Sequence, residues 1–135
     1  MGHQTVMVLL AEDSDTQRSL LAALLRQRGL GVLPAVDGAE ALALLGREAP
    51  DLVITDHEMP GARGIEVALA ARRLHPSARV LITSASADGA RAARRAGFDF
   101  MGKPIALAPL LAWVAANAPA WVVPDGAVER PHPAG

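Results

Sequence analysis

Acidic, hydroxyl and amino side chains end four separate apolar runs of this sequence. Asp56 ends one run, the pair Glu12 and Asp13 ends another, Ser84 ends a third and Lys103 ends a fourth. Parallel strands of an open α/β sheet bring such ends together at one edge, where ligands bind. Carboxylates, a hydroxyl and an ammonium gathered there suit a divalent metal ion and a phosphoryl group. The spacing therefore predicts a metal-dependent phosphoryl-transfer site.

Asp56 is the candidate nucleophile, because a carboxylate can attack an activated phosphoryl group and form an acyl phosphate. Alone, this carboxylate would be interpreted as the simple end of a strand, but Glu12, Asp13 and Lys103 accompany it. Three clustered carboxylates repel one another, and binding protons or metal relieves that repulsion. Mg²⁺ is the expected cofactor, since it prefers hard oxygen ligands and bridges to phosphate. An alternative role for Asp13 is to cap the following helix.

Lys103 is the expected contact to the phosphoryl oxygens, where its charge would offset charge that develops during transfer. It is the only lysine among the 13 basic residues of the chain, and the others are arginines. A lysine offers a compact point charge; the alternative is an ordinary surface lysine. His57 invites a catalytic interpretation because histidine is a common acid–base residue, but we expect it to face away from the site. The other histidines suggest no ligand cluster: they are His3, His75 and His132.

The composition limits the class of protein. A chain of 135 residues with 51% hydrophobic content suits one folded domain. Its net charge of −1 gives no general attraction to nucleic acid, and the lack of cysteine excludes a disulfide framework. The N-terminus lacks the regions of a signal peptide, so we expect a cytoplasmic protein. Residues 104–124 are uncharged and mostly apolar, but prolines interrupt them, so we expect no membrane partner.

Five short apolar runs alternate with helical patterns, which predicts βαβ units around a parallel sheet. The second run contains Pro34, which cannot donate to a strand ladder and so favours an edge position. Residues 119–135 hold four of the ten prolines and are expected to form a tail or linker. The expected strands are 6–11, 31–36, 52–55, 80–83 and 98–102, and the expected helices begin near residues 15, 38, 65, 88 and 106.

Two of these helices carry apolar stripes that we expect to pack against the sheet. The stripe of the first helix is Leu20, Leu21, Leu24 and Leu25, and that of the last helix is Leu107, Leu110, Leu111 and Val114.

Short motifs occur in a fixed order between residue 6 and about residue 117: Ala11-Glu12-Asp13, Asp51 to Asp56, Met59-Pro60 with Gly64, Ser84-Ala85, Gly97 and Lys103-Pro104-Ile105. Together they resemble the receiver domain of bacterial two-component response regulators, the family of the chemotaxis response regulator. The resemblance implies a flavodoxin-like (βα)5 fold with strand order 2-1-3-4-5, in a receiver domain over residues 5–118. The first and last motifs are similar to those of the hybrid histidine kinase subtype.

The resemblance also implies roles in the reaction. Asp56 would accept a phosphoryl group from a histidine kinase or a phosphotransfer protein of a phosphorelay. Asp13 would bind Mg²⁺ directly, Glu12 mostly through water, and Glu58 through its backbone carbonyl. The protein would then be a signalling switch with intrinsic autophosphorylation and autodephosphorylation chemistry, and not an enzyme with a separate substrate.

Two further positions would transmit the switch. Ser84 would hydrogen-bond the transferred phosphoryl group, although Thr83 is a competing hydroxyl. Phe100 occupies the position of the family's switch aromatic, with plain core packing as the alternative.

The last helix presents alanines and Trp113 outside its buried stripe and carries no charge. An apolar surface with a charged margin has the anatomy of an interface, and the family often docks partners in this region. We expect a homodimer or partner contact there; the alternative is that Trp113 packs on Trp121 and Val122. The charged margin would be Arg91, Arg94, Arg95 and Asp99.

The sequence is also compatible with two other functions. One is a Mg²⁺-dependent phosphatase with an aspartyl nucleophile, like the haloacid dehalogenase family, in which Glu58 would stand where a general acid is required. The other is an unphosphorylated scaffold of the same fold. The residues after 118 are too few for an output module, so we expect a stand-alone receiver or part of a hybrid kinase.

Overall fold

Five parallel strands form one sheet in the computed structural model, which describes residues 5–119. The strand order β2-β1-β3-β4-β5 confirms the expected doubly wound α/β fold and puts β2, with its proline, at an edge. The strands are β1 Met7–Ala11, β2 Gly31–Ala35, β3 Leu52–Asp56, β4 Arg79–Ser84 and β5 Asp99–Gly102. The helices are α1 Asp15–Gln27, α2 Gly38–Arg47, α3 Gly64–Leu74, α4 Ala87–Ala96 and α5 Leu107–Asn117.

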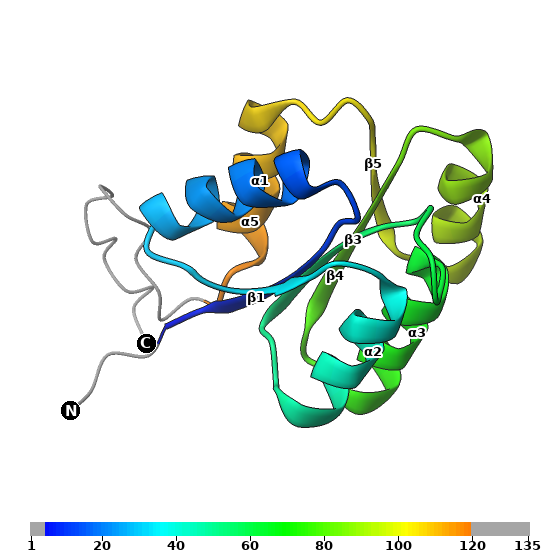
Figure 1. Ribbon diagram of the computed structural model, residues 1–135, viewed down its shortest axis with the longest axis horizontal. Coiled ribbons are helices and arrows are strands. Elements are labelled where there is room, and N and C mark those ends of the chain that lie inside the picture. The colour runs from blue at the N-terminus through cyan, green and yellow to red at the C-terminus, as the bar shows by residue number, and fades with distance from the viewer. Residues whose placement is uncertain (1–4, 120–135) are drawn as a thin grey trace, which may run out of the picture.

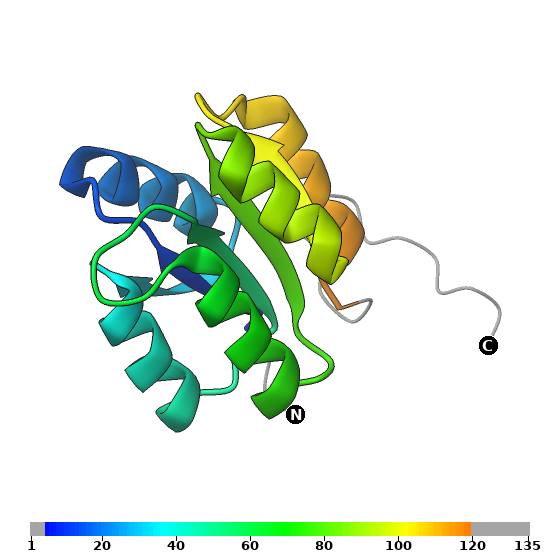
Figure 2. The same ribbon diagram turned by 90° about the vertical axis from the view of Figure 1, so that its right-hand side faces the viewer.

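Helices α1 and α5 cover one face of the sheet, and α2, α3 and α4 cover the other (Figure 1, Figure 2). Successive residues of a strand point to opposite faces, so the sheet separates two apolar cores. In β3, Leu52 and Ile54 join the core under α1 and α5, whereas Val53 joins the core under the other three helices. Burial on both faces explains why β3 consists of apolar or β-branched residues from Leu52 to Thr55.

The helices that follow β1, β2 and β4 begin at capping side chains. Ser14, Asp37 and Ser86 each accept a hydrogen bond from a backbone N–H in the first turn of the helix. The start of α3 instead needs a glycine, because a Cβ at Gly64 would lie 2.3 Å from the backbone oxygen of Asp56. Strand ends and helix N-termini therefore meet at one edge of the sheet.

The predicted apolar stripes are wrong at two leucines. Leu20 is 56% exposed, since α1 turns Leu21, Ala22 and Leu25 toward the sheet. Leu107 is 44% exposed at the start of α5. The buried residues of α5 are Leu110 and Val114, and the partly buried Ile105 of the preceding loop packs against the same core.

The last strand begins one residue later than predicted. The amide of Phe98 donates to the carbonyl of Ala93 at 2.9 Å and Gly97 has a φ of 82°, so this stretch closes α4 and cannot join the ladder. Within residues 5–119, no helix combines the length and apolarity needed to cross a membrane. The expected tail lies outside the described residues, apart from Pro119.

Candidate functional site

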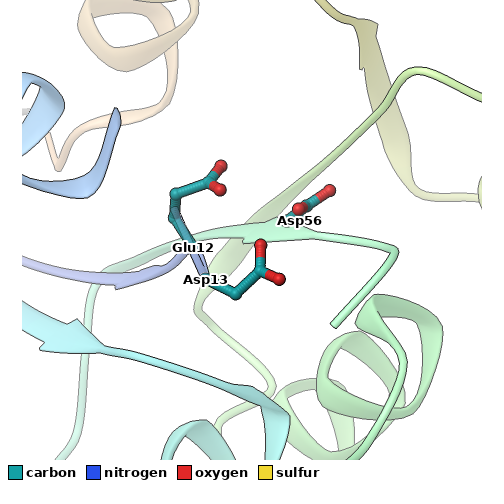
Figure 3. Close-up of side chains that lie close together, drawn as sticks. All are labelled: Glu12, Asp13 and Asp56. Atoms are coloured by element: carbon teal, nitrogen blue, oxygen red, sulfur yellow. The ribbon is translucent and has the colours of Figure 1, made fainter. Parts of the chain in front are cut away.

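Three carboxylates converge at the carboxyl ends of β1 and β3 (Figure 3). Glu12 and Asp13 follow β1 directly, and Asp56 is the last residue of β3. The two strands are neighbours, with Ala11 paired to Thr55. One oxygen from each carboxylate can be chosen such that all lie within 4.8 Å of one another. The predicted meeting of these acids is confirmed.

Asp56 is 4% exposed, and its two oxygens differ in their contacts. Oδ2 lies 3.1 Å from Nζ of Lys103, whereas Oδ1 has no hydrogen-bond partner within residues 5–119. Burial raises the pKa of Asp56, Lys103 partly offsets this, and the charges of Glu12 and Glu58 raise it further. A buried oxygen without a partner, beside two other carboxylates, fits a divalent cation.

Lys103 joins two of the acids. Its Nζ lies 2.8 Å from Oε1 of Glu12 and 3.1 Å from Oδ2 of Asp56. Burial alone would lower the pKa of Lys103, but hydrogen bonds and charge from these carboxylates outweigh it and raise the pKa. The side chain is therefore a fixed ammonium inside the site, as predicted, and not a surface lysine.

Glu12 and Asp13 are placed differently. Glu12 is 2% exposed, and its oxygens are engaged by Lys103 and by the backbone N–H of Ser14 at 3.0 Å. Asp13 is exposed, and Ser14 caps α1 in its place. Capping therefore does not occupy the Asp13 carboxylate, which stays open to a ligand.

Ser84 and Glu58 meet at the carboxyl ends of β3 and β4. Ser84 is 1% exposed, and its hydroxyl lies 2.7 and 2.8 Å from the two oxygens of Glu58. The hydroxyl of Ser86 donates to the same carboxylate at 2.7 Å. Partial burial alone would raise the pKa of Glu58, but these hydroxyls outweigh it and lower the pKa. A carboxylate held in its ionised form does not suit the general acid that the phosphatase alternative requires.

Ser86 is a site residue that sequence reasoning missed. Its place three residues before Gly89, at the start of a helical pattern, could have identified it as a cap. Only the folded loop shows that its hydroxyl also binds Glu58.

His57 is buried, and Nε2 lies 3.4 Å from Oδ2 of Asp88 in α4. Its partner is thus in α4 and not among the three clustered carboxylates. His75 lies beside the carbonyl of Leu45, with Nε2 at 2.8 Å from the oxygen. His3 and His132 lie outside the described residues.

The residues expected to form the switch and interface are spread over several elements. Phe100 is half-buried and packs against the core under α2, α3 and α4. The indole N–H of Trp113 donates to Asp99 at 2.8 Å, which ties α5 to β5. Arg94 is exposed on α4, whereas Arg91 and Arg95 line a groove of about 420 Å³ between α3 and α4. The suggested packing of Trp113 on Trp121 and Val122 involves residues outside the described part.

Comparison with known sequences identifies relatives of this chain. Residues 8–115 match the profile of a family described as the response regulator receiver domain. The transcriptional regulatory protein PrrA of Mycobacterium tuberculosis is 38% identical over 113 residues, which make up 82% of this chain and 48% of that protein. The transcriptional regulatory protein GlrR of Escherichia coli is 32% identical over 108 residues, 78% of this chain and 24% of that protein. The chain thus spans between about a quarter and about half of these relatives.

Solved structures agree with this assignment. The receiver domain of the hybrid histidine kinase CckA has a TM-score of 0.70 and 36% identity, over 82% of this chain and 97% of that one. A response regulator protein from Burkholderia pseudomallei, solved with a phosphorylated aspartic acid, a calcium ion and citrate, has a TM-score of 0.72 and 28% identity. That match covers 79% of this chain and 65% of the other.

Proposed function

This chain belongs to the response regulator receiver family, whose members are phosphorylation switches of two-component signalling, and we propose that Asp56 is its phosphoacceptor. The observation that carries this proposal is the contrast between the two oxygens of Asp56. Oδ2 is held by Lys103, whereas the buried Oδ1 has no partner within residues 5–119. The free oxygen can act as the nucleophile or bind a cation, while the lysine offsets charge on the transferred group.

The cation is proposed to be Mg²⁺, which would neutralise charge between the acids and the phosphoryl oxygens. Asp13 and Asp56 would hold it directly, because their carboxylates retain free oxygens. Glu12 would act through water, since Lys103 and the amide of Ser14 already engage its oxygens. The fourth contributor is the backbone carbonyl of Glu58, which follows the end of β3.

The implied partner is a histidine kinase, either directly or through a histidine phosphotransfer protein. The setting of the whole protein is proposed to be cytoplasmic. A hybrid kinase receiver and a transcriptional regulatory protein are 36% and 38% identical to this chain, so identity favours neither kind of whole protein.

A docking or dimer surface is proposed on α5 and β5. The exposed Leu107 adds apolar area to this surface, and the bond between Trp113 and Asp99 holds its middle in one arrangement. Because Trp113 is bonded to β5, a movement of Lys103 at the end of β5 would be passed on to the surface of α5.

Labelling of matched variants tests the proposed acceptor. The protein is incubated with Mg²⁺ and a small phosphodonor, and phosphate incorporation is measured for wild type, Asp56→Asn and Asp51→Asn. Asp51 directly precedes the first residue of β3, and its carboxylate accepts a hydrogen bond from the amide of Met7 at 2.9 Å. We expect incorporation in wild type and Asp51→Asn only; label retained by Asp56→Asn would overturn the proposal.

A further inference from the structure

The carboxylate of Glu58 is held at the N-terminus of α4 by two hydroxyl groups. Ser84 Oγ lies 2.7 Å from its nearer oxygen, and Ser86 Oγ donates to the same oxygen at 2.7 Å. Ser86 also accepts the amide of Gly89 at 3.1 Å as the cap of the helix. The position therefore combines hydroxyl donors with the positive end of a helix, and an acidic side chain of the chain itself fills it.

Ser84 is also the hydroxyl that we expect to bind the phosphoryl group on Asp56. A hydroxyl has a single proton to donate. The proton that binds Glu58 is therefore unavailable to a phosphoryl oxygen. The two anions would compete for one donor, and they would also repel each other.

The backbone around Ser84 limits other ways to free its hydroxyl. A Cβ at Gly89 would lie 2.4 Å from Ser84 Oγ, so the start of α4 already closes tightly over this side chain. Glu58, by contrast, is exposed at the mouth of the site. Its carboxylate can move into water, where it is well solvated, and so leave the Ser84 hydroxyl free for another acceptor.

We propose that Glu58 is an internal competitor of the phosphoryl group: by accepting the Ser84 hydroxyl it holds the loop between β4 and α4 in its unphosphorylated arrangement and weakens the phosphorylated state. This proposal rests on the proposed function of Asp56. Glu58 acts through Ser84 and is a positioning residue. The Glu58 carboxylate would have to leave Ser84 and Ser86 before the Ser84 hydroxyl could bind the phosphoryl group.

A double-mutant cycle tests the competition. Beryllofluoride with Mg²⁺ serves as the phosphoryl analogue, and its dissociation constant is measured by NMR for wild type, Glu58→Gln, Ser84→Ala and the double variant. Glu58→Gln should bind the analogue about tenfold more tightly, the change expected for one charge-assisted hydrogen bond. In the Ser84→Ala background the same substitution should change the constant by less than about threefold. Glu48→Gln, at the far end of α2, is the matched control and should match wild type.

Two results would overturn the proposal. An unchanged constant in Glu58→Gln would show that the carboxylate does not oppose the analogue. An equal gain in both backgrounds would show charge repulsion without competition for Ser84. If the proposed function itself were wrong, wild type would not be phosphorylated on Asp56 by a small phosphodonor. That labelling result is independent of the binding constants measured for the analogue. The amide signals of Ser84, Ser86 and Gly89 should also shift in Glu58→Gln without any donor, and unshifted signals would contradict the contact itself.

Discussion

The ammonium of Lys103 lies 3.1 Å from the carboxylate of Asp56, although β3 and β5 are not neighbours in the sheet. The strand between them is β4, which ends at Ser84. The Lys103 side chain therefore reaches past the end of β4 to Asp56. It joins the proposed acceptor to the loop between β5 and α5. Charge added at Asp56 would act on both Ser84 and Lys103, and so on the carboxyl ends of both β4 and β5.

Metal affinity should depend more on Asp13 than on Glu12. Asp13→Ala removes an open carboxylate and should weaken Mg²⁺ binding by at least about tenfold. Glu12→Ala should cost less, because Lys103 and the amide of Ser14 already engage its oxygens. Calorimetric titration of the two variants and Asp56→Ala decides between these roles. If Glu12→Ala binds most weakly, the assignment of direct and water-mediated ligands is wrong.

Ionised Asp56 should lower the free energy of unfolding of the metal-free protein. Its folded-state pKa is raised, mainly by burial. Its stabilising contribution is thus present below the unfolded pKa and is lost as pH rises through the folded pKa. Metal-free Asp56→Asn should be more stable than wild type at pH ~7, and the difference should vanish near pH ~3. Urea unfolding with a chelator at both pH values measures this, and a more stable wild type at neutral pH would oppose it.

Core and surface leucines should respond very differently to truncation. Leu110→Ala removes a side chain that is 1% exposed, and unfolding free energy should fall by about 2–5 kcal/mol. Leu20→Ala, at 56% exposure, should stay within about 0.5 kcal/mol of wild type. Urea denaturation compares them, and equal losses would contradict the burial of Leu110 on α5 and the exposure of Leu20 on α1.

The face formed by α5 and β5 should mediate association. Leu107→Glu should weaken dimer formation or partner binding, because it puts charge on an exposed apolar residue without opening the core. Leu69→Glu on α3 is the matched control, since the two leucines are 44% and 46% exposed. Sedimentation with and without a phosphoryl analogue and the intended partner provides the measurement. If the two variants associate equally well, α5 only packs on the sheet and the proposed association surface is wrong.

The sequence was sufficient for the fold and for the meeting of Glu12, Asp13, Asp56 and Lys103. Apolar runs followed by polar residues mark strand ends, and parallel strands align those ends at one edge. Periodicity was less reliable at Leu20, because leucines 20, 21, 24 and 25 span a wide arc of the helix and the sheet contacts only part of it. The arc that is buried includes Ala22, which a pattern of leucines does not reveal.

The contacts of Glu58 could not be predicted. They depend on where the loop between β4 and α4 places two hydroxyls, and no periodic pattern records this. The burial of His57 against Asp88 depends in the same way on how α4 is seated on the sheet.

Direct mapping of the phosphorylated residue tests the central claim most sharply. The protein is incubated with Mg²⁺ and a small phosphodonor, the acyl phosphate is reduced with borohydride, and the modified residue is located by mass spectrometry. The account predicts a single Mg²⁺-dependent modification at Asp56 in wild type. Modification at Glu12, Asp13 or Glu58 with Asp56 unmodified would contradict it.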